Sequence, residues 1–281
     1  MSDRISALLA RFQLHARLLH SGALHQVLAL DEGRRGSHLH LLCSGQLELA
    51  TGSGQRIAVS EPCILLLPRP LAHQLIPGPG VPPELVSAAI DFGPGDENPL
   101  LRGLPDVLHV PLAPLQASAA VLVLVQQALV AEAAAQRCGH VAVVDRLVEV
   151  LVIQLLRHAM AQRLVDVGVL AGLADARLSR VLNALHAEPE QPWTLDTMAL
   201  LAGMSRARFA AHFSAALGTP PGEYLATWRI GLARSLLRQG RSVKQVAPEV
   251  GYANASALAR AFTKRLGQSP TAWLLQEFQG Q

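Results

Sequence analysis

Three histidines in the first third of the chain have types and spacing suited to binding a metal ion. His38 and His40 form a His-x-His pair, and His73 ends the later segment PRPLAH. If residues 38–40 lie on a β-strand, both imidazoles point to the same face, because side chains alternate along a strand. Converging neutral imidazoles bind divalent ions such as Zn²⁺, Fe²⁺, Mn²⁺ or Ni²⁺. The pattern predicts a metal site, with Zn²⁺ as the first candidate. Alternatively, the three histidines are ordinary polar side chains that line the inside of the domain.

Two cysteines in the same region offer a second kind of chemistry. Cys43 and Cys63 could sense oxidants, because a thiolate beside imidazoles or a metal is activated. Buried cysteines also serve as small core residues, and Cys43 falls on the opposite face of a regular strand from the His-x-His pair. Both interpretations stay open. The candidate effector or metal residues are therefore His38, His40, His73, Cys43 and Cys63.

Basic side chains near the other end of the chain suggest a different ligand. Residues 193–270 contain ten Arg or Lys residues and three acidic residues, a net charge of +7, whereas residues 1–192 carry a net charge of −3. Positive charge concentrated in one segment is typical of a nucleic-acid-binding module attached to a neutral one.

The basic segment contains an internal duplication. The sequence GYANASALARAFTKRLGQSP at 251–270 repeats the pattern of GMSRARFAAHFSAALGTPP at 203–221. With an offset of 49 residues, Phe213 matches Phe262 and Gly218 matches Gly267; with an offset of 48, Gly203 matches Gly251. One inserted residue explains the change of offset. The repeat indicates a duplicated supersecondary unit.

Each copy is predicted to consist of two short helices joined by a glycine turn. Gly203 and Gly251 occupy the turns, where a left-handed residue is needed. Helix, short turn and helix form the DNA-binding arrangement whose second helix enters the major groove. A plain helical hairpin used for packing is the alternative. Pro248 predicts a kink in the supporting helix of the second copy. The predicted helix caps are Thr194, Ser205, Ser242 with Gln245, and Asn254.

The duplicated region resembles a known family. The segments WTLDTMALLAGMSRARFAAHFSAALGTPPGEYLATWRIGLARSLL and SVKQVAPEVGYANASALARAFTKRLGQSPTAW resemble the DNA-binding domain of AraC/XylS-type transcription regulators, over about Ala176 to Trp273. The resemblance implies two helix-turn-helix units in one monomer, joined by a long helix from about Gly222 to Leu237. Two such units would read successive major grooves about 34 Å apart.

The two second helices are not equally equipped to read bases. Arg260 can contact guanine or phosphate, whereas the first copy presents alanines, and members of the family often carry an arginine where this chain has Ala211. We therefore expect the second helix to make more polar base contacts and the first to be held mainly by phosphates. The predicted DNA-binding residues are Ser205, Arg206, Ala207, Arg208, Ala211, His212, Asn254, Ser256, Arg260, Thr263 and Lys264.

The N-terminal region reads as short strands followed by two helices. Residues 20–110 alternate short apolar runs with Gly and Pro, which favours an all-β barrel or sandwich. Residues 116–137 and 140–162 predict two antiparallel helices that are buried or pair with a second chain. The stretch from HLHLLCSGQLEL to CILLLPRPLAHQL, then NPLLRGLP, resembles the cupin sensor of one branch of the AraC/XylS family. It departs from the cupin metal motifs, because no Glu follows His40 closely and Pro70 replaces a glycine; the cysteine that this branch commonly carries near Ser87 is also absent.

Composition excludes several other classes of protein. The longest apolar stretch, Ala117 to Ala135, is interrupted by Gln126, Gln127 and Glu132, which argues against a membrane span. The N-terminus lacks the continuous apolar core of a secretion signal. Three cysteines do not indicate a disulfide framework. We therefore expect a cytoplasmic protein with no membrane partner.

These observations predict an α+β protein of two domains. A cupin-like sensor barrel is expected at 1–115, a helical dimerisation and linker region at 116–175, and an all-α double helix-turn-helix domain at 176–281. The predicted function is sequence-specific regulation of transcription in response to a small-molecule, metal or redox signal. Expected partners are double-stranded DNA, a small-molecule effector, a second copy of the chain and, if the protein is an activator, RNA polymerase. The alternative is a cupin-type metalloenzyme with a structural helical domain; we expect no enzyme and no catalytic residue, because the basic segment has no role in that case.

Overall fold

The computed structural model describes residues 5, 8–9, 14–30, 36–92, 98, 100–101, 103–113 and 120–279. Its backbone contacts divide the chain into two compact units. The first contains the β-strands and the two helices that end before Val165, and the second contains the helices from Asp166 onward. The α+β fold class is confirmed.

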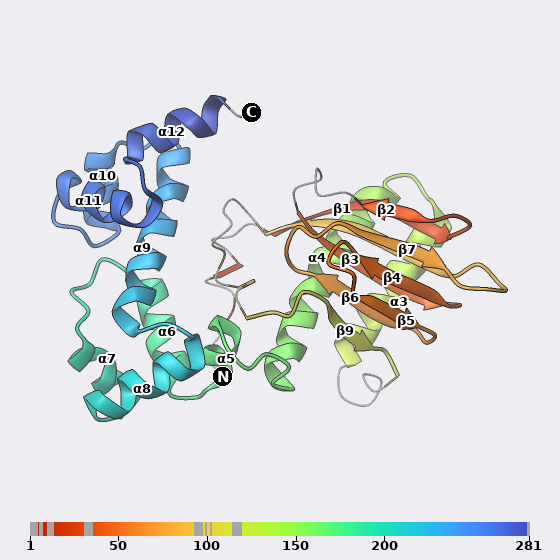
Figure 1. Cartoon of the computed structure of the whole chain (residues 1–281), viewed down its shortest axis with the longest axis horizontal. Helices are drawn as coiled ribbons and strands as arrows, with labels where there is room; N and C mark the ends of the chain where they lie inside the picture. Colours follow the sequence, from red (N-terminus) through yellow and green to blue (C-terminus); the bar gives the residue numbers. More distant parts are fainter. Residues whose placement is uncertain are drawn as a thin grey trace. The chain divides into compact units, whose positions relative to one another are not determined.

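The part of the first unit that the structure describes contains nine β-strands in two antiparallel sheets (Figure 1). Sheet A has the order β1-β8-β3-β6-β9 and sheet B the order β2-β7-β4-β5. The strands are β1 (His15–Ala23), β2 (Leu28–Leu30), β3 (Ser37–Ser44), β4 (Leu47–Thr51), β5 (Arg56–Val59), β6 (Cys63–Leu67), β7 (His73–Pro77), β8 (Glu84–Asp91) and β9 (Leu108–Pro111).

The two sheets pack against each other through a leucine-rich core. Alternation along the strands sends Leu42, Leu65 and Leu85 of sheet A toward Leu49 and Leu75 of sheet B, and these side chains form one buried cluster. Strand β6, with the sequence CILLL, is buried along its whole length. A strand with both faces buried needs no polar alternation, which explains its continuous apolar run.

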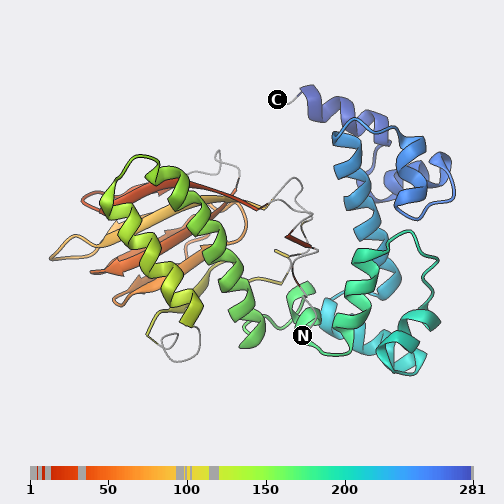
Figure 2. The ribbon, with the colours of Figure 1, turned by 180° about the vertical axis from the view of Figure 1, so that it is seen from behind.

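Two helices cover the outer face of sheet A (Figure 2). They are α3 (Ala120–Ala135) and α4 (His140–Ala161), within the predicted ranges, of which residues 116–119 lie outside the described part. Two carboxylates of α4 accept hydrogen bonds from the edge strand β1: Asp145 from the backbone N–H of Leu18 at 2.7 Å and Glu149 from that of Ala16 at 3.2 Å. Donors of an edge strand that would otherwise face water or another chain are thereby satisfied.

The second unit is all-helical in the part that the structure describes. Figure 1 shows α9 running between two groups of short helices. The helices are α5 (Val169–Ala174), α6 (Leu178–Ala187), α7 (Leu195–Ala202), α8 (Arg206–Leu217), α9 (Pro221–Arg238), α10 (Val243–Glu249), α11 (Ala255–Leu266) and α12 (Pro270–Gln279).

The duplication extends to the backbone hydrogen bonds of the turns. Gly203 after α7 and Gly251 after α10 both have left-handed backbones, with φ of 64° and 82°. In each copy the residue after the glycine donates its N–H to the carbonyl five positions earlier, Met204 to Ala199 and Tyr252 to Ala247. This pattern satisfies orphan carbonyls at a helix end. The two predicted glycine turns are confirmed.

The helix caps follow the predictions with one difference. Ser242 and Gln245 form a reciprocal capping box at the start of α10, and Asn254 accepts from the N–H of Ala257 at the start of α11. Ser205 occupies the N-cap position of α8, but its side chain makes no cap hydrogen bond. Pro248 lies in the last turn of α10, which ends directly after it at Glu249.

We predict that Ser242→Ala lowers the free energy of unfolding of the second unit by about 1 kcal/mol, because the hydroxyl that accepts the backbone N–H of Gln245 at the start of α10 is lost. All three tryptophans and both tyrosines lie in this unit, so denaturant titration followed by tryptophan fluorescence reports on it selectively. Ser205→Ala is the matched control and should change the value by only a few tenths of 1 kcal/mol. Equal effects of the two substitutions would contradict the assignment.

Candidate nucleic-acid interface and sensor-domain site

Helix α8 buries one side and exposes the other. Phe209, Phe213 and Leu217 are buried, so the opposite side of the helix faces solvent. Arg206 lies 3.7 Å from Asp196 of α7, and both side chains are largely exposed, so this ion pair contributes little. The predicted residues on the exposed side are Ser205, Arg206, Ala207, Arg208 and Ala211.

His212 of α8 is engaged within the protein. Its Nε2 lies 2.8 Å from Oδ2 of Asp175, and Oδ1 of Asp175 accepts the backbone N–H groups of Arg177 and Leu178 at the start of α6. Partial burial raises the pKa of Asp175, but hydrogen bonds from Leu178, His212 and Arg177 outweigh it and hold that pKa below its ordinary value. His212 therefore joins α8 to α6, in addition to its predicted place beside DNA.

Helix α11 presents a more polar exposed side. Leu258 and Phe262 are buried in the core of the second copy, and the predicted residues Asn254, Ser256, Arg260, Thr263 and Lys264 are all exposed. Arginine and short hydroxyl side chains on one helix face can bond to base edges and phosphates. Ala207 and Ala211 at the corresponding surface of α8 offer only apolar contact.

Sequence reasoning did not select Arg265, which joins α11 to α9. Its guanidinium donates to Oγ1 of Thr227 and Oε2 of Glu223, both at 2.6 Å. An arginine next to Lys264 on a basic helix gives no sign in the sequence that it points inward. Only the packing of α11 on α9 shows that Arg265 bonds to α9 while Lys264 is exposed.

The predicted histidines of the first unit converge inside the barrel. His38 and His40 lie on β3 with the same facing, as alternation predicted, and His73 reaches them from β7 of the other sheet. Nδ1 of His73 donates to the carbonyl of Leu71 at 2.7 Å, so its Nε2 accepts from Nε2–H of His40 at 2.8 Å. Nδ1 of His40 in turn accepts from the hydroxyl of Ser87 at 3.0 Å. This chain of hydrogen bonds satisfies both rings in their neutral forms.

This arrangement does not fit the predicted metal ion. Nε2 of His40 and Nε2 of His73 share a hydrogen bond at 2.8 Å, whereas two nitrogens bound to a tetrahedral Zn²⁺ at about 2.0–2.1 Å would lie about 3.3 Å apart. Across the described ranges, no three His, Cys, Asp or Glu side chains are grouped so that they could hold a metal ion. The hydroxyl of Ser87 and the carbonyl of Leu71 complete the hydrogen bonds of His40 and His73.

The two cysteines are held as protonated thiols. Cys63 is buried in the apolar core between the sheets, and burial together with Glu61 raises its pKa to about 12. Cys43 lies at a β-bulge between β3 and β8, where burial and Glu84 raise its pKa to about 11. Since the thiolate is the reactive form, these surroundings oppose the activation that a redox sensor requires.

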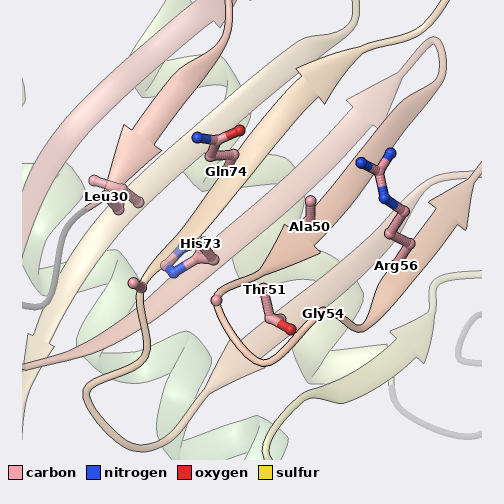
Figure 3. A pocket seen from close by; sticks show the side chains of 9 residues that line it. Leu30, Ala50, Thr51, Gly54, Arg56, His73 and Gln74 are labelled. Atoms are coloured by element: carbon pink, nitrogen blue, oxygen red, sulfur yellow. The ribbon is translucent and has the colours of Figure 1, made fainter.

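A cavity of about 310 Å³ lies beside His73 at the end of sheet B (Figure 3). Strand register places Arg56, Ala50 and Gln74 in one cross-strand row, and Figure 3 shows their side chains projecting from the same face. Arg56 forms an exposed ion pair with Glu48 at 2.6 Å. The cavity is lined by Leu30, Ala50, Thr51, Gly52, Gly54, Arg56, Ala72, His73 and Gln74. Of these, only His73 was selected from the sequence, because a row across three strands depends on their pairing.

Comparison with known families accounts for both units. A cupin family model matches residues 3–161, more than half of the chain, and a helix-turn-helix domain model matches residues 198–276. The chain belongs to the AraC/XylS-type regulators with a cupin domain. No helix in the described part of the chain has the length and apolarity needed to cross a membrane.

Several named transcription regulators are similar to part of the chain. An AraC-like transcription regulator of Streptomyces antibioticus is 38% identical over 66% of this chain and 61% of its own length. The regulator AlkR of Acinetobacter baylyi is 32% identical over 66% of this chain and 60% of its own length. The matches thus span about three fifths of these relatives. The DNA-binding domain of AdpA, a global transcriptional factor solved with a target DNA, is 35% identical and covers 35% of this chain and 89% of its own, with a TM-score of 0.33.

The buried histidines predict a loss of stability in acid. Burial lowers the pKa of His40 and of His73 in the folded state, whereas in the unfolded state a histidine has a pKa of about 6.5. Below that pH the unfolded chain binds protons that the folded chain does not. The contribution of these histidines to the free energy of unfolding is therefore fully present above about pH 6.5 and falls as pH decreases, by up to about 1.4 kcal/mol per pH unit for each histidine.

Urea titrations of the full chain between pH 7.5 and 5, followed by the methyl NMR signals of the leucines in the core between the two sheets, measure this slope. His40→Gln should remove the part of this pH dependence that comes from one buried histidine. His25→Gln, at an exposed loop position, should leave the slope unchanged. A stability that is flat or rises toward pH 5 would contradict neutral burial.

Proposed function

We propose that the protein is a sequence-specific, double-stranded-DNA-binding regulator of transcription. The observation that carries the proposal is the pair of helices α8 and α11, which occupy equivalent positions in two helix-turn-helix units built on the single helix α9. Helix α8 buries Phe209 and Phe213, α11 buries Leu258 and Phe262, and each helix leaves its opposite side exposed. Family membership and the net positive charge of the segment support the same function.

Within this proposal, α11 contributes most of the base contacts. Arg260 has the donor geometry for guanine or phosphate, and Ser256 and Thr263 can bond to either. In the first helix-turn-helix copy, Arg206 and Arg208 hold phosphates, together with backbone N–H groups at the start of α8. The alanines of α8 add at most contact with a thymine methyl group.

DNA binding is tested by gel-shift titration with the duplex upstream of the protein's own gene at two salt concentrations. Affinity should fall steeply with salt, because phosphate contacts release counterions. Arg260→Ala should weaken binding by about tenfold or more, and Arg208→Ala by less. Arg17→Ala, an exposed arginine on β1, is the control and should bind as the unaltered protein does.

Absence of binding at low salt would refute the DNA-binding proposal. A larger loss for Arg208→Ala than for Arg260→Ala would instead reverse the roles assigned to the two helices while leaving DNA binding intact.

The proposed signal is a small polar molecule bound by the first unit. The cavity at the end of sheet B offers a guanidinium from Arg56, an amide from Gln74 and a hydroxyl from Thr51. A metal signal has less support, because His40 and His73 are hydrogen-bonded to each other, and a redox signal has less support, because both thiols have raised pKa values. RNA polymerase is a partner within this proposal if the protein activates transcription.

Dimerisation is proposed through the outer side of α3. Val121 and Leu124 are 55% and 62% exposed, and Ala128, Ala131 and Ala135 continue the same stripe at helical spacing. The stripe contains no charged residue. A second copy of the chain is the proposed occupant, because an apolar stripe of this kind can pair with itself across a twofold axis.

Sedimentation at micromolar concentration tests the dimer. We expect a dimer for the unaltered protein and a monomer for Leu124→Glu, because burying an unpaired carboxylate at the interface is costly. Leu200→Glu is the matched control: Leu200 is 81% exposed but lies on α7 of the other unit, so this variant should remain dimeric. A monomeric unaltered protein would refute the proposal.

A further inference from the structure

Both helix-turn-helix units are attached to α9, but by different segments of it. Tyr224 packs edge-on against Phe213 of the first helix-turn-helix copy, whereas Ile230, Ala233 and Leu237 belong to the core of the second copy. A continuous helix sets the distance between the units along its axis. The helix does not by itself set how each helix-turn-helix copy is rotated about that axis. This rotation depends on contacts that side chains of α9 make with neighbouring segments.

Arg229 lies between these two segments and contacts the connection that leads into α7 of the first helix-turn-helix copy. Its Nε donates to the carbonyl of Pro189 and its Nη2 to the carbonyl of Gln191, both at 2.8 Å. These carbonyls belong to the short connection between α6 and α7. The side chain is partly buried, and burial lowers the pKa of Arg229. The planar guanidinium matches two separated carbonyls in a way that a lysine ammonium does not.

The same side chain also contacts the α10–α11 turn of the second helix-turn-helix copy. A Cβ at Gly251 would lie 2.6 Å from Cζ of Arg229 and 2.7 Å from the carbonyl oxygen of Pro189. The ring of the next residue, Tyr252, lies 5.9 Å from the Arg229 guanidinium. The connection, α9 and the α10–α11 turn therefore meet at one closely packed junction.

The first helix-turn-helix copy has no such junction at the equivalent glycine. Gly203 corresponds to Gly251 in the duplication and has a similar left-handed backbone, yet a Cβ built there meets nothing within 4 Å. Left-handed backbone geometry alone therefore explains Gly203. A glycine at position 251 is also required by the close approach of Arg229. This approach is a contact between the two helix-turn-helix copies and is not part of the repeated fold.

We propose that Arg229 is a positioning residue that sets the spacing between DNA half-sites that the protein accepts. The inference rests on the proposed DNA-binding function. By joining the connection before α7 to the turn that precedes α11, Arg229 fixes the rotation of α11 relative to α8. Because two major-groove contacts on one face must match the helical repeat of DNA, that rotation determines which spacings both helices can contact at once.

The test uses the full-length protein and an operator selected from randomised duplexes, with one base pair inserted or removed between its half-sites. The unaltered protein should bind the altered spacings about tenfold more weakly. Arg229→Lys keeps the charge but loses the paired carbonyl contacts, and it should reduce this preference to about twofold. Gly251→Ala, which places a methyl group in the junction, should do the same.

Lys264→Ala is the matched control, because Lys264 is an exposed cation of α11 outside the junction. It should weaken binding at every spacing by the same factor and leave the preference unchanged. Thermal melting followed by tryptophan fluorescence establishes that each variant is folded. A spacing preference retained by both Arg229→Lys and Gly251→Ala would overturn the inference.

A measurement without DNA separates this inference from the proposed function. Spin labels at Ala211→Cys and Thr263→Cys, in a chain carrying Cys43→Ala and Cys138→Ser, report the distance between α8 and α11. Arg229→Lys should broaden the distance distribution, and an unchanged distribution would overturn the inference. If the unaltered protein binds no DNA, the proposed function fails, while this distance measurement still decides whether Arg229 fixes the two helices.

Discussion

The second unit depends on apolar burial against a single shared helix. Each helix-turn-helix copy consists of helices of seven to twelve residues, and helices this short are marginal on their own because nucleation is costly. The copies become stable by packing on α9, which presents Tyr224 and Trp228 at one end and Ile230 and Leu237 at the other. Because α9 is continuous, the two copies share one support.

Packing on a shared helix leaves the outer surfaces of the copies free to differ. The buried positions repeat, with Phe209 and Phe213 matched by Leu258 and Phe262, whereas Ala211 faces solvent on α8 and Arg260 faces solvent on α11. Core residues of a duplicated unit are constrained by the same neighbours, but exposed residues are constrained only by what they bind. The polar bonds that tie the copies down also differ: His212 is bound to Asp175 and Arg265 to Glu223.

In the first unit, two histidines that share one face of β3 fit either a metal site or a hydrogen-bonded cluster by their spacing alone. His38 and His40 face the barrel interior, where a metal ion was one expectation, but His40 is bonded to His73 and Ser87. Burial of neutral imidazoles is inexpensive when each nitrogen has a partner. A short hydroxyl from β8 and a backbone carbonyl supply those partners, and neither was recognisable from the His-x-His spacing alone.

The sequence by itself determined the two-domain α+β organisation, the duplication, the glycine turns and the capping box at Ser242, because these depend on local periodicity and on residues close together in the chain. Only the tertiary structure decided that Arg265 points toward α9, that Gly251 is crowded while Gly203 is open, and that His40 bonds to His73. Each of these contacts joins residues more than twenty positions apart. Their geometry depends on how whole elements pack, and no local pattern encodes it.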